Sequence, residues 1–149
     1  MRYGFSLHRG RGHEVYSKLK YLHSVYISVK ERIEEFHVKN LTEARELIAS
    51  IGCDEKSIDI MAPKAVFKVL LIRDVNPIDA IIIKQDMLSI GGEVAIPRNV
   101  FWRKEKCEIL IMGTLRHLST LVEKLKRHHT SIREIARLIE SELEEWIQS

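Results

Sequence analysis

A strand followed directly by a capped helix stands at the centre of the chain. Residues 66–75, VFKVLLIRDV, are rich in the aliphatic and β-branched side chains typical of a strand. Asn76 then occupies an N-cap position, and Pro77 the first helical position, where its missing N–H costs no hydrogen bond. Asp79 lies in the first turn of this helix, where its negative charge interacts favourably with the positive end of the helix dipole. The sequence therefore predicts a strand and then a helix from residue 77, and the apolar run 69–72 predicts that both faces of the strand are buried.

The end of this helix is marked just as clearly. We expect it to run to Ile90, because Gly91 can adopt the left-handed conformation that commonly ends a helix. Gly92 then frees the chain to turn into the extended segment EVAIP. A helix placed between two strands implies a layer of helices packed on a sheet.

Similar sequence signals for strands and helices occur on both sides of this central unit. RIEEFHV (residues 32–38) alternates like a strand, and Asn40 with Glu43 forms a capping box for a helix that Gly52 ends. Residues 58–75 are β-rich but interrupted by Pro63, which leaves 66–75 as the strand. These patterns predict a strand and a helix ahead of the central unit.

The C-terminal half predicts a hairpin and two helices. Segments 94–102 and 107–113 read as strands joined by the charged turn RKEK, and residues 115–125 carry a helical stripe. Ser131 and Glu134 predict a capping box for a last helix. We therefore expect an α/β fold, with α+β as the alternative, in which a sheet of about four strands is covered by helices in the order α-βαβαββαα.

One domain, preceded by an N-terminal arm and helix, is expected for a chain of this length. Residues 1–31 form a basic arm and an amphipathic helix, and residues 32–149 form a single α/β domain. At 45% hydrophobic and 30% charged residues the composition is typical of a soluble globular protein. The N-terminus lacks the apolar core of a secretory signal, so we expect a cytoplasmic location. The small number of Asn and Gln beside many Lys, Arg and Glu favours a thermophilic source.

Several kinds of chemistry find no support in the residues. Cys53 and Cys107 have no C-x-x-C spacing and are expected to be buried small hydrophobes. The seven histidines show no metal-binding spacing, and no nucleophile elbow, Walker motif or G-x-G-x-x-G loop occurs. We therefore expect no metal and no cofactor.

One candidate ligand site lies around the helix-to-strand turn at the two glycines. Polar residues gather there and at the ends of predicted strands, where α/β sheets usually bind ligands. An anion site is one interpretation, and an ordinary solvated junction between helix and strand is the other. The candidate ligand-binding residues are Lys64, Lys84, Gln85, Gly91, Gly92, Glu93, Arg98 and Thr114.

The basic arm suggests a different kind of partner. Residues 1–20 carry five Lys or Arg against one Glu, and HRGRGH lies near Tyr3 and Phe5. This mixture is similar to RNA-contacting segments, in which guanidiniums meet phosphates and rings stack on bases. The alternative is a loosely packed terminal arm.

Three stretches carry a resemblance to a known family. MAPKAVFKVLLI, IIIKQDMLSIGGEVAI and ILIMGTLRHL, followed by LVEKLK, resemble a region found ahead of the catalytic barrel in a subset of dihydropteroate synthases. The resemblance covers about residues 32–143. Asp86 stands where Glu is usual, and Ile81 where Asn is expected. The M-G-I-x-N-x-T-P-D-S-F signature of the barrel has no counterpart in these residues, so we expect no synthase activity from them.

The resemblance implies a stand-alone accessory or ligand-binding domain related to pterin or folate-type metabolism. Its partners would be a pterin-type small molecule or an enzyme of the pterin pathway. An RNA-associated protein using the basic arm, or an uncharacterised enzyme, are the alternatives. The apolar stripes of the first helix and of the last helix, which ends with Trp146 and Ile147, predict a homo-oligomer such as a dimer. No membrane partner is expected, since no apolar run approaches the roughly 20 residues of a membrane span.

Overall fold

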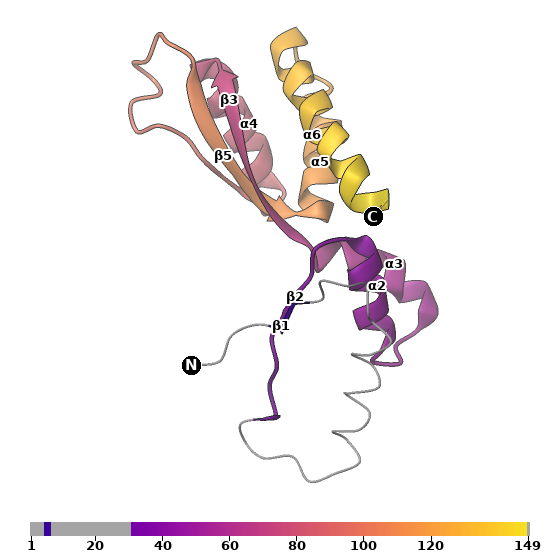
Figure 1. The fold of residues 1–149 in the computed structure, drawn as a ribbon. Coiled ribbons are helices and arrows are strands. Elements are labelled where there is room, and N and C mark those ends of the chain that lie inside the picture. Colours follow the sequence, from indigo (N-terminus) through magenta and orange to yellow (C-terminus); the bar gives the residue numbers. More distant parts are fainter. Residues whose placement is uncertain (1–4, 7–30, 149) are drawn as a thin grey trace. The chain divides into compact units, whose positions relative to one another are not determined.

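The computed structural model describes residues 5–6 and 31–148 (Figure 1). The chain divides into two compact units, residues 1–66 with 146–149 and residues 67–145. This boundary falls inside the stretch that the sequence predicts to be one domain. The predicted first helix and most of the basic arm lie outside the described residues.

In its described residues, unit 1 contains a short strand pair and two helices. Strand β1 (Phe5–Ser6) pairs in parallel with β2 (Phe36–His37), and helices α2 (Leu41–Ala49) and α3 (Glu55–Met61) follow, with a 3-10 turn η2 (Ala62–Lys64). The strand predicted over residues 32–38 is therefore much shorter, and it pairs with β1 instead of joining the larger sheet.

Helix α2 begins as its capping residues predict. The Asn40 Oδ1 atom accepts a hydrogen bond from the Glu43 N–H at 2.9 Å, and the Glu43 carboxylate accepts one from the Lys39 N–H at 2.9 Å. The reciprocal bond of the box thus reaches one residue further back than the N-cap. Gly52, at φ +82°, follows the helix in the left-handed region.

Helix α3 was not predicted, since its residues Ile58 and Ile60 read as part of a β-rich segment. Its start is set by Asp54, whose side chain accepts a hydrogen bond from the Lys56 N–H at 3.2 Å. An aspartate at an N-cap satisfies a backbone donor that has no partner within the helix, and here this local contact outweighs the β-branched side chains.

Unit 2 is built on a three-stranded antiparallel sheet. Its strands β3 (Phe67–Val75), β4 (Glu93–Ala95) and β5 (Cys107–Thr114) lie in the order β3-β5-β4. The predicted α/β class, with a small sheet covered by helices, is confirmed, although this sheet has three strands where about four were expected. The hairpin of β4 and β5 also forms, but β4 ends at Ala95 and residues 96–106 make a long connection.

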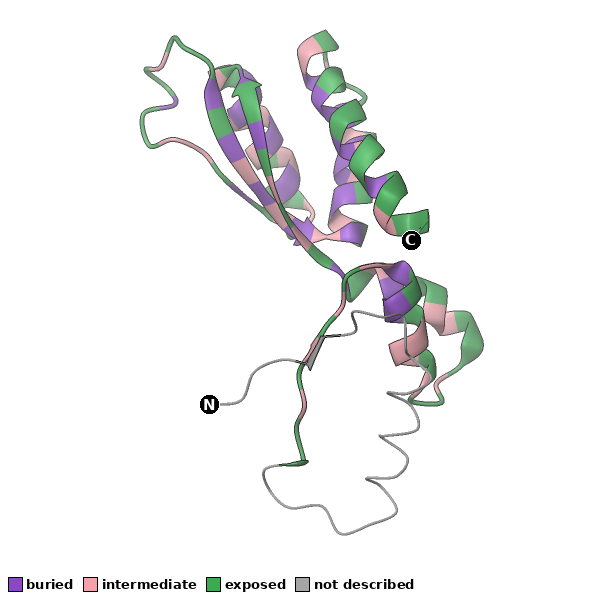
Figure 2. Ribbon diagram, viewed as in Figure 1, coloured by how far each residue is buried: buried purple, intermediate pink, exposed green. Residues whose placement is uncertain are grey.

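Unit 2 contains helices α4 (Pro77–Ser89) and α5 (Leu115–Leu125), and helix α6 (Thr130–Gln148) as far as Glu145. Helices α4 and α5 pack against the sheet, and the side chains between the layers are almost completely buried (Figure 2). Each such aliphatic side chain contributes roughly 1.5–3 kcal/mol through the area it removes from water. The largest of them are Ile83, Met87, Ile109, Ile111, Leu118 and Leu121.

The opposite face of β3 is exposed. Phe67, Val69 and Leu71 retain 58%, 56% and 47% of their accessible surface, whereas Ile72 retains 8%. The prediction that both faces of residues 69–72 are buried is therefore wrong. An apolar run shows that both faces of a strand are hydrophobic, but β3 is an edge strand of an antiparallel sheet whose helices cover the other face.

The two cysteines differ in burial. Cys107 is buried and its Sγ lies 3.4 Å from the Val75 carbonyl oxygen, and burial raises the pKa of its thiol. Cys53 is only half-buried, which corrects the expectation for that residue. Among the described helices, none has the length and apolar character needed to cross a membrane.

Candidate functional site at the junction of α4 and β4

The two glycines close helix α4 with two backbone hydrogen bonds. Gly91, at φ +97°, donates its N–H to the Leu88 carbonyl at 3.2 Å, and Gly92 donates to the Met87 carbonyl at 3.1 Å. This is the Schellman arrangement, in which a residue in the left-handed region lets the chain satisfy the last carbonyls of the helix. The predicted role of Gly91 is confirmed, and the helix ends at Ser89, one residue before the predicted end.

Met87 is enclosed between two glycines that are distant in sequence. A Cβ atom added to Gly92 would lie 2.7 Å from the Met87 Sδ, and one added to Gly113 would lie 2.6 Å from the Met87 Cε. Both separations are shorter than real Cβ contacts allow, and Met87 is fully buried. An added Cβ at either glycine, in the IGGE or the IMGT stretch, would therefore displace the end of the Met87 side chain.

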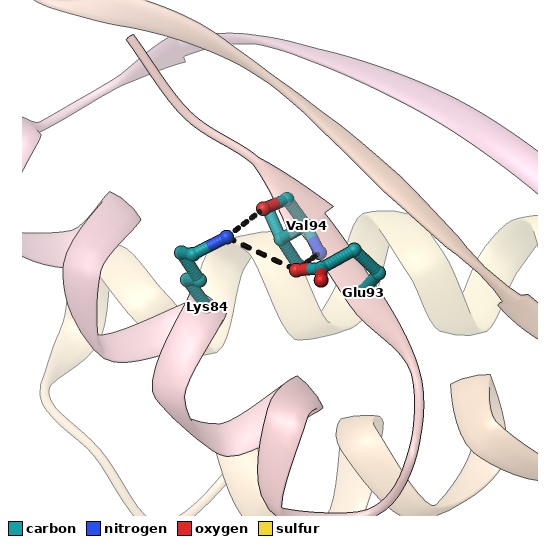
Figure 3. Close-up of polar contacts among 3 residues, drawn as sticks. All are labelled: Lys84, Glu93 and Val94. Carbon is teal, nitrogen blue, oxygen red and sulfur yellow. Dashed lines mark hydrogen bonds and ion pairs between the residues drawn. The ribbon is translucent and has the colours of Figure 1, made fainter. Parts of the chain in front are cut away.

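Lys84 and Glu93 face each other across the turn (Figure 3). The Lys84 Nζ atom lies 3.0 Å from Glu93 Oε1 and 2.7 Å from the Val94 carbonyl oxygen. Glu93 Oε1 also accepts a hydrogen bond from the Val94 N–H at 2.9 Å. The ion pair joins the last part of α4 to the first residue of β4, and both side chains stay accessible, at 33% for Lys84 and 53% for Glu93.

These contacts set the charge of the carboxylate. The hydrogen bond from Lys84, with help from the Val94 N–H and the charge of Lys84, lowers the pKa of Glu93 below its ordinary value of 4.5. Glu93 is therefore an ionised acceptor at neutral pH, beside a lysine with three donors. The junction presents one negative and one positive group, side by side and open to solvent.

Thr114 has a structural role at the start of α5. Its Oγ1 accepts a hydrogen bond from the His117 N–H at 3.2 Å, while the His117 Nδ1 accepts one from the Thr114 N–H at 3.1 Å. This is a capping box in which a histidine takes the place of the usual Glu or Gln. The His117 Nε2 atom would lie 3.4 Å from a Cβ at Gly91, so the start of α5 lies beside the end of α4.

The structure brings together only part of the predicted site. Lys84 and Glu93 are paired, Gly91 and Gly92 form the turn beside them, and Thr114 caps the neighbouring helix. Gln85 and Arg98 are exposed, and Lys64 is exposed on η2 of the other unit. Among the candidate residues with long polar side chains, the contacts seen join Lys84 to Glu93.

A polar cluster at the start of α4 was missed by the sequence analysis. The buried Asp79 has its Oδ1 2.9 Å from the His129 Nε2 and its Oδ2 2.6 Å from the Ser131 hydroxyl, which donates to it. The Asn76 amide lies 3.4 Å from the same carboxylate. Ser131 therefore lies inside α6, which begins at Thr130, and bonds to Asp79, so the predicted Ser131 and Glu134 capping box is wrong.

A second contact of the same kind lies further along α4. The Asp86 Oδ2 atom is 2.9 Å from the His128 Nε2, so adjacent histidines contact two aspartates on α4. Asp79 and Asp86 are seven residues apart and thus share one face of the helix, which is the only local signal that could have linked them. Within the described residues no group of three or more His, Cys, Asp or Glu is arranged to hold a metal ion.

Comparison with known proteins adds no relative. No family model matches this chain, and searches of curated proteins and of solved structures gave no match.

Proposed function

We propose that this chain is an accessory, ligand-binding domain of pterin or folate-type metabolism, cytoplasmic and without synthase activity of its own. The observation that supports it is the meeting of two of the resembling stretches at one junction. Lys84, Met87 and Glu93 come from the middle stretch and Gly113 from IMGT; Lys84 pairs with Glu93, and Met87 packs against Gly113.

The chemistry of the junction suits the edge of a pterin ring. That edge offers a ring N–H and an amino group as adjacent donors, with a carbonyl oxygen beside them. An ionised carboxylate accepts two such donors, and a lysine ammonium donates to the carbonyl. Glu93 and Lys84 supply these two groups, and both are accessible to a ligand from solvent.

Calorimetric titration of the full chain with a reduced hydroxymethylpterin and with its pyrophosphate tests this proposal. We expect saturable binding that weakens about tenfold or more in Glu93→Gln and in Lys84→Met, because each removes a charged hydrogen-bonding group. The double variant Glu55→Gln/Lys56→Met is the matched control, since it makes the same changes at exposed positions of α3. The absence of saturable heat, or equal weakening in the control, would overturn the proposal.

RNA association through the basic arm is the second candidate, and its residues lie almost entirely outside the described ones. The positive charge of residues 1–20, which carry five Lys or Arg against one Glu, supports RNA association. We also propose that the chain forms a homo-oligomer and that an enzyme of the pterin pathway is its protein partner.

A further inference from the structure

The connection between β4 and β5 exposes two adjacent aromatic rings. Phe101 retains 74% of its accessible surface and Trp102 retains 86%, which are the largest exposures among the described aromatic side chains. Large aromatic side chains carry much apolar area, so leaving two of them in water is costly unless a partner covers them. We call residues 96–106 the aromatic loop. It lies at the end of the sheet where Val75 pairs with Cys107 (Figure 1).

Most of the charged side chains in the aromatic loop are positive. Its eleven residues, IPRNVFWRKEK, include four Lys or Arg and one Glu. Arg98 precedes the rings, and Arg103, Lys104 and Lys106 follow them. Arg103 Nε is buried without a hydrogen-bond partner among the described residues, and Glu105 Oε2 is 4.0 Å away from it. Glu105 therefore does little to neutralise the positive charge of Arg103.

Backbone hydrogen bonds hold the aromatic loop in a defined shape. The Val100 N–H donates to the Pro97 carbonyl at 3.2 Å, and the Trp102 N–H to the Asn99 carbonyl at 3.0 Å. Val100 itself is 3% exposed and anchors the loop to the protein. Because these turns order the loop backbone before any partner binds, less conformational entropy is lost on binding.

We propose that the aromatic loop binds single-stranded nucleic acid. Bases stack on Phe101 and Trp102, while phosphates contact Arg98, Lys104 and Lys106. Aromatic rings interleaved with cations form the usual surface for single strands, since every base offers a face for stacking. A membrane surface fits less well, because insertion depends on buried apolar area and Val100 at the centre of the loop points into the protein. The proposal uses neither Lys84 nor Glu93, although Arg98 is among the ligand-binding residues predicted from the sequence.

Fluorescence anisotropy with a labelled 15-nucleotide single-stranded RNA of mixed sequence tests the inference on the full chain. We expect binding by the wild-type protein that Phe101→Ala/Trp102→Ala weakens by about tenfold or more, since two stacking platforms are lost. Ile60→Ala/Leu138→Ala is the matched control, because it removes two exposed apolar side chains elsewhere. A thermal melt by circular dichroism confirms that each variant is folded.

Salt dependence provides a second readout. Lys104→Gln/Lys106→Gln should reduce the slope of log affinity against log salt by roughly 1.4, because two phosphate contacts to a single strand are lost. Lys56→Gln/Arg137→Gln removes the same net charge at exposed positions outside the loop and should change the slope less. Equal changes in both pairs would show a general charge effect and would overturn the inference.

Three further results would also overturn it. The first is unchanged RNA affinity in the aromatic variant. The second is that RNA affinity is lost only in Arg9→Gln/Arg11→Gln and in no variant of the aromatic loop, which would assign RNA binding to the basic arm. The third is binding only to vesicles of phosphatidylcholine with phosphatidylserine, which would make the loop a membrane contact. None of these outcomes depends on whether pterins bind at Lys84 and Glu93.

Discussion

Gly92 and Gly113 contact the same buried methionine, and this makes the packing at the junction sensitive to a single methyl group. We predict that Gly113→Ala lowers the free energy of unfolding by about 1–3 kcal/mol, because a Cβ there meets Met87 in a core without room for it. Chemical denaturation measures the change. The double variant Gly113→Ala/Met87→Ala should lose less unfolding free energy than the two single variants lose together. The reason is that the shortened side chain at position 87 leaves room for the Cβ at position 113.

Gly52→Ala is the control for this prediction. Gly52 has a positive φ but no atom within 4 Å of an added Cβ, so its substitution reports backbone strain without a clash. Additive losses for Gly113→Ala and Met87→Ala would contradict the packing described at the junction.

The pKa of Glu93 carries a prediction of pH dependence. Because its pKa in the folded protein is lowered from 4.5, ionised Glu93 stabilises the fold above that value, and this stabilisation is lost as the pH falls through the lowered pKa. The difference in unfolding free energy between wild type and Glu93→Gln should therefore shrink in acid. Carbon-13 NMR titration of the Glu93 carboxyl gives the pKa directly, and Lys84→Ala should move that pKa back toward 4.5. A pKa at or above 4.5 in the wild type would refute the ion pair.

At the scale of elements, α4 is joined to the turn between α5 and α6 by two aspartates. Asp79 is 3% exposed as a side chain and has three polar partners, whereas Asp86 is 21% exposed and contacts His128. We predict that Asp79→Ala lowers the unfolding free energy by about 2–3 kcal/mol, because it leaves the Ser131 hydroxyl without its buried acceptor and removes the contact to His129. Asp86→Ala should lower it by about 1 kcal/mol or less, because partly exposed side-chain contacts contribute little. Equal losses in denaturant unfolding would contradict this ranking.

The elements with local signals were predicted well. Asn40 and the stretch from Asn76 to Gly92 carry their start and stop chemistry within a few residues, so α2 and α4 could be located from the sequence. Lys84 and Glu93 are brought together by a two-glycine turn, and their role as ligand-binding residues stays a prediction. Helix α3 was missed because its β-branched residues hid the Asp54 cap, and the length of β4 depends on its pairing with β5.

Contacts between distant residues could not be predicted. His129 lies 50 residues from Asp79, and no local pattern shows that the turn before α6 reaches the start of α4. The exposed face of β3 is a similar case, since an apolar strand does not reveal how many layers of helices will cover it. The missed part of the polar cluster and the wrong burial prediction both arise from tertiary packing.

At the scale of the whole molecule, apolar surface remains on the outer face of the sheet. Phe67, Val69 and Leu71 are about half exposed on neighbouring positions of one face of β3. With this exposed apolar surface, we predict a homodimer of twice 17.4 kDa, about 35 kDa. Sedimentation velocity over a range of concentrations measures the mass. Val69→Lys should shift the protein toward monomer, and a monomer at all concentrations in the wild type would contradict the prediction.

Amide chemical shifts on addition of a reduced hydroxymethylpterin test the central claim most directly. In the full chain labelled with nitrogen-15, we predict saturable shifts confined to Lys84 and to residues 91–94 and 113–114, and their loss in Glu93→Gln. Shifts spread over other parts of the chain, or no shifts at millimolar ligand, would contradict the account and leave the junction as a purely structural turn.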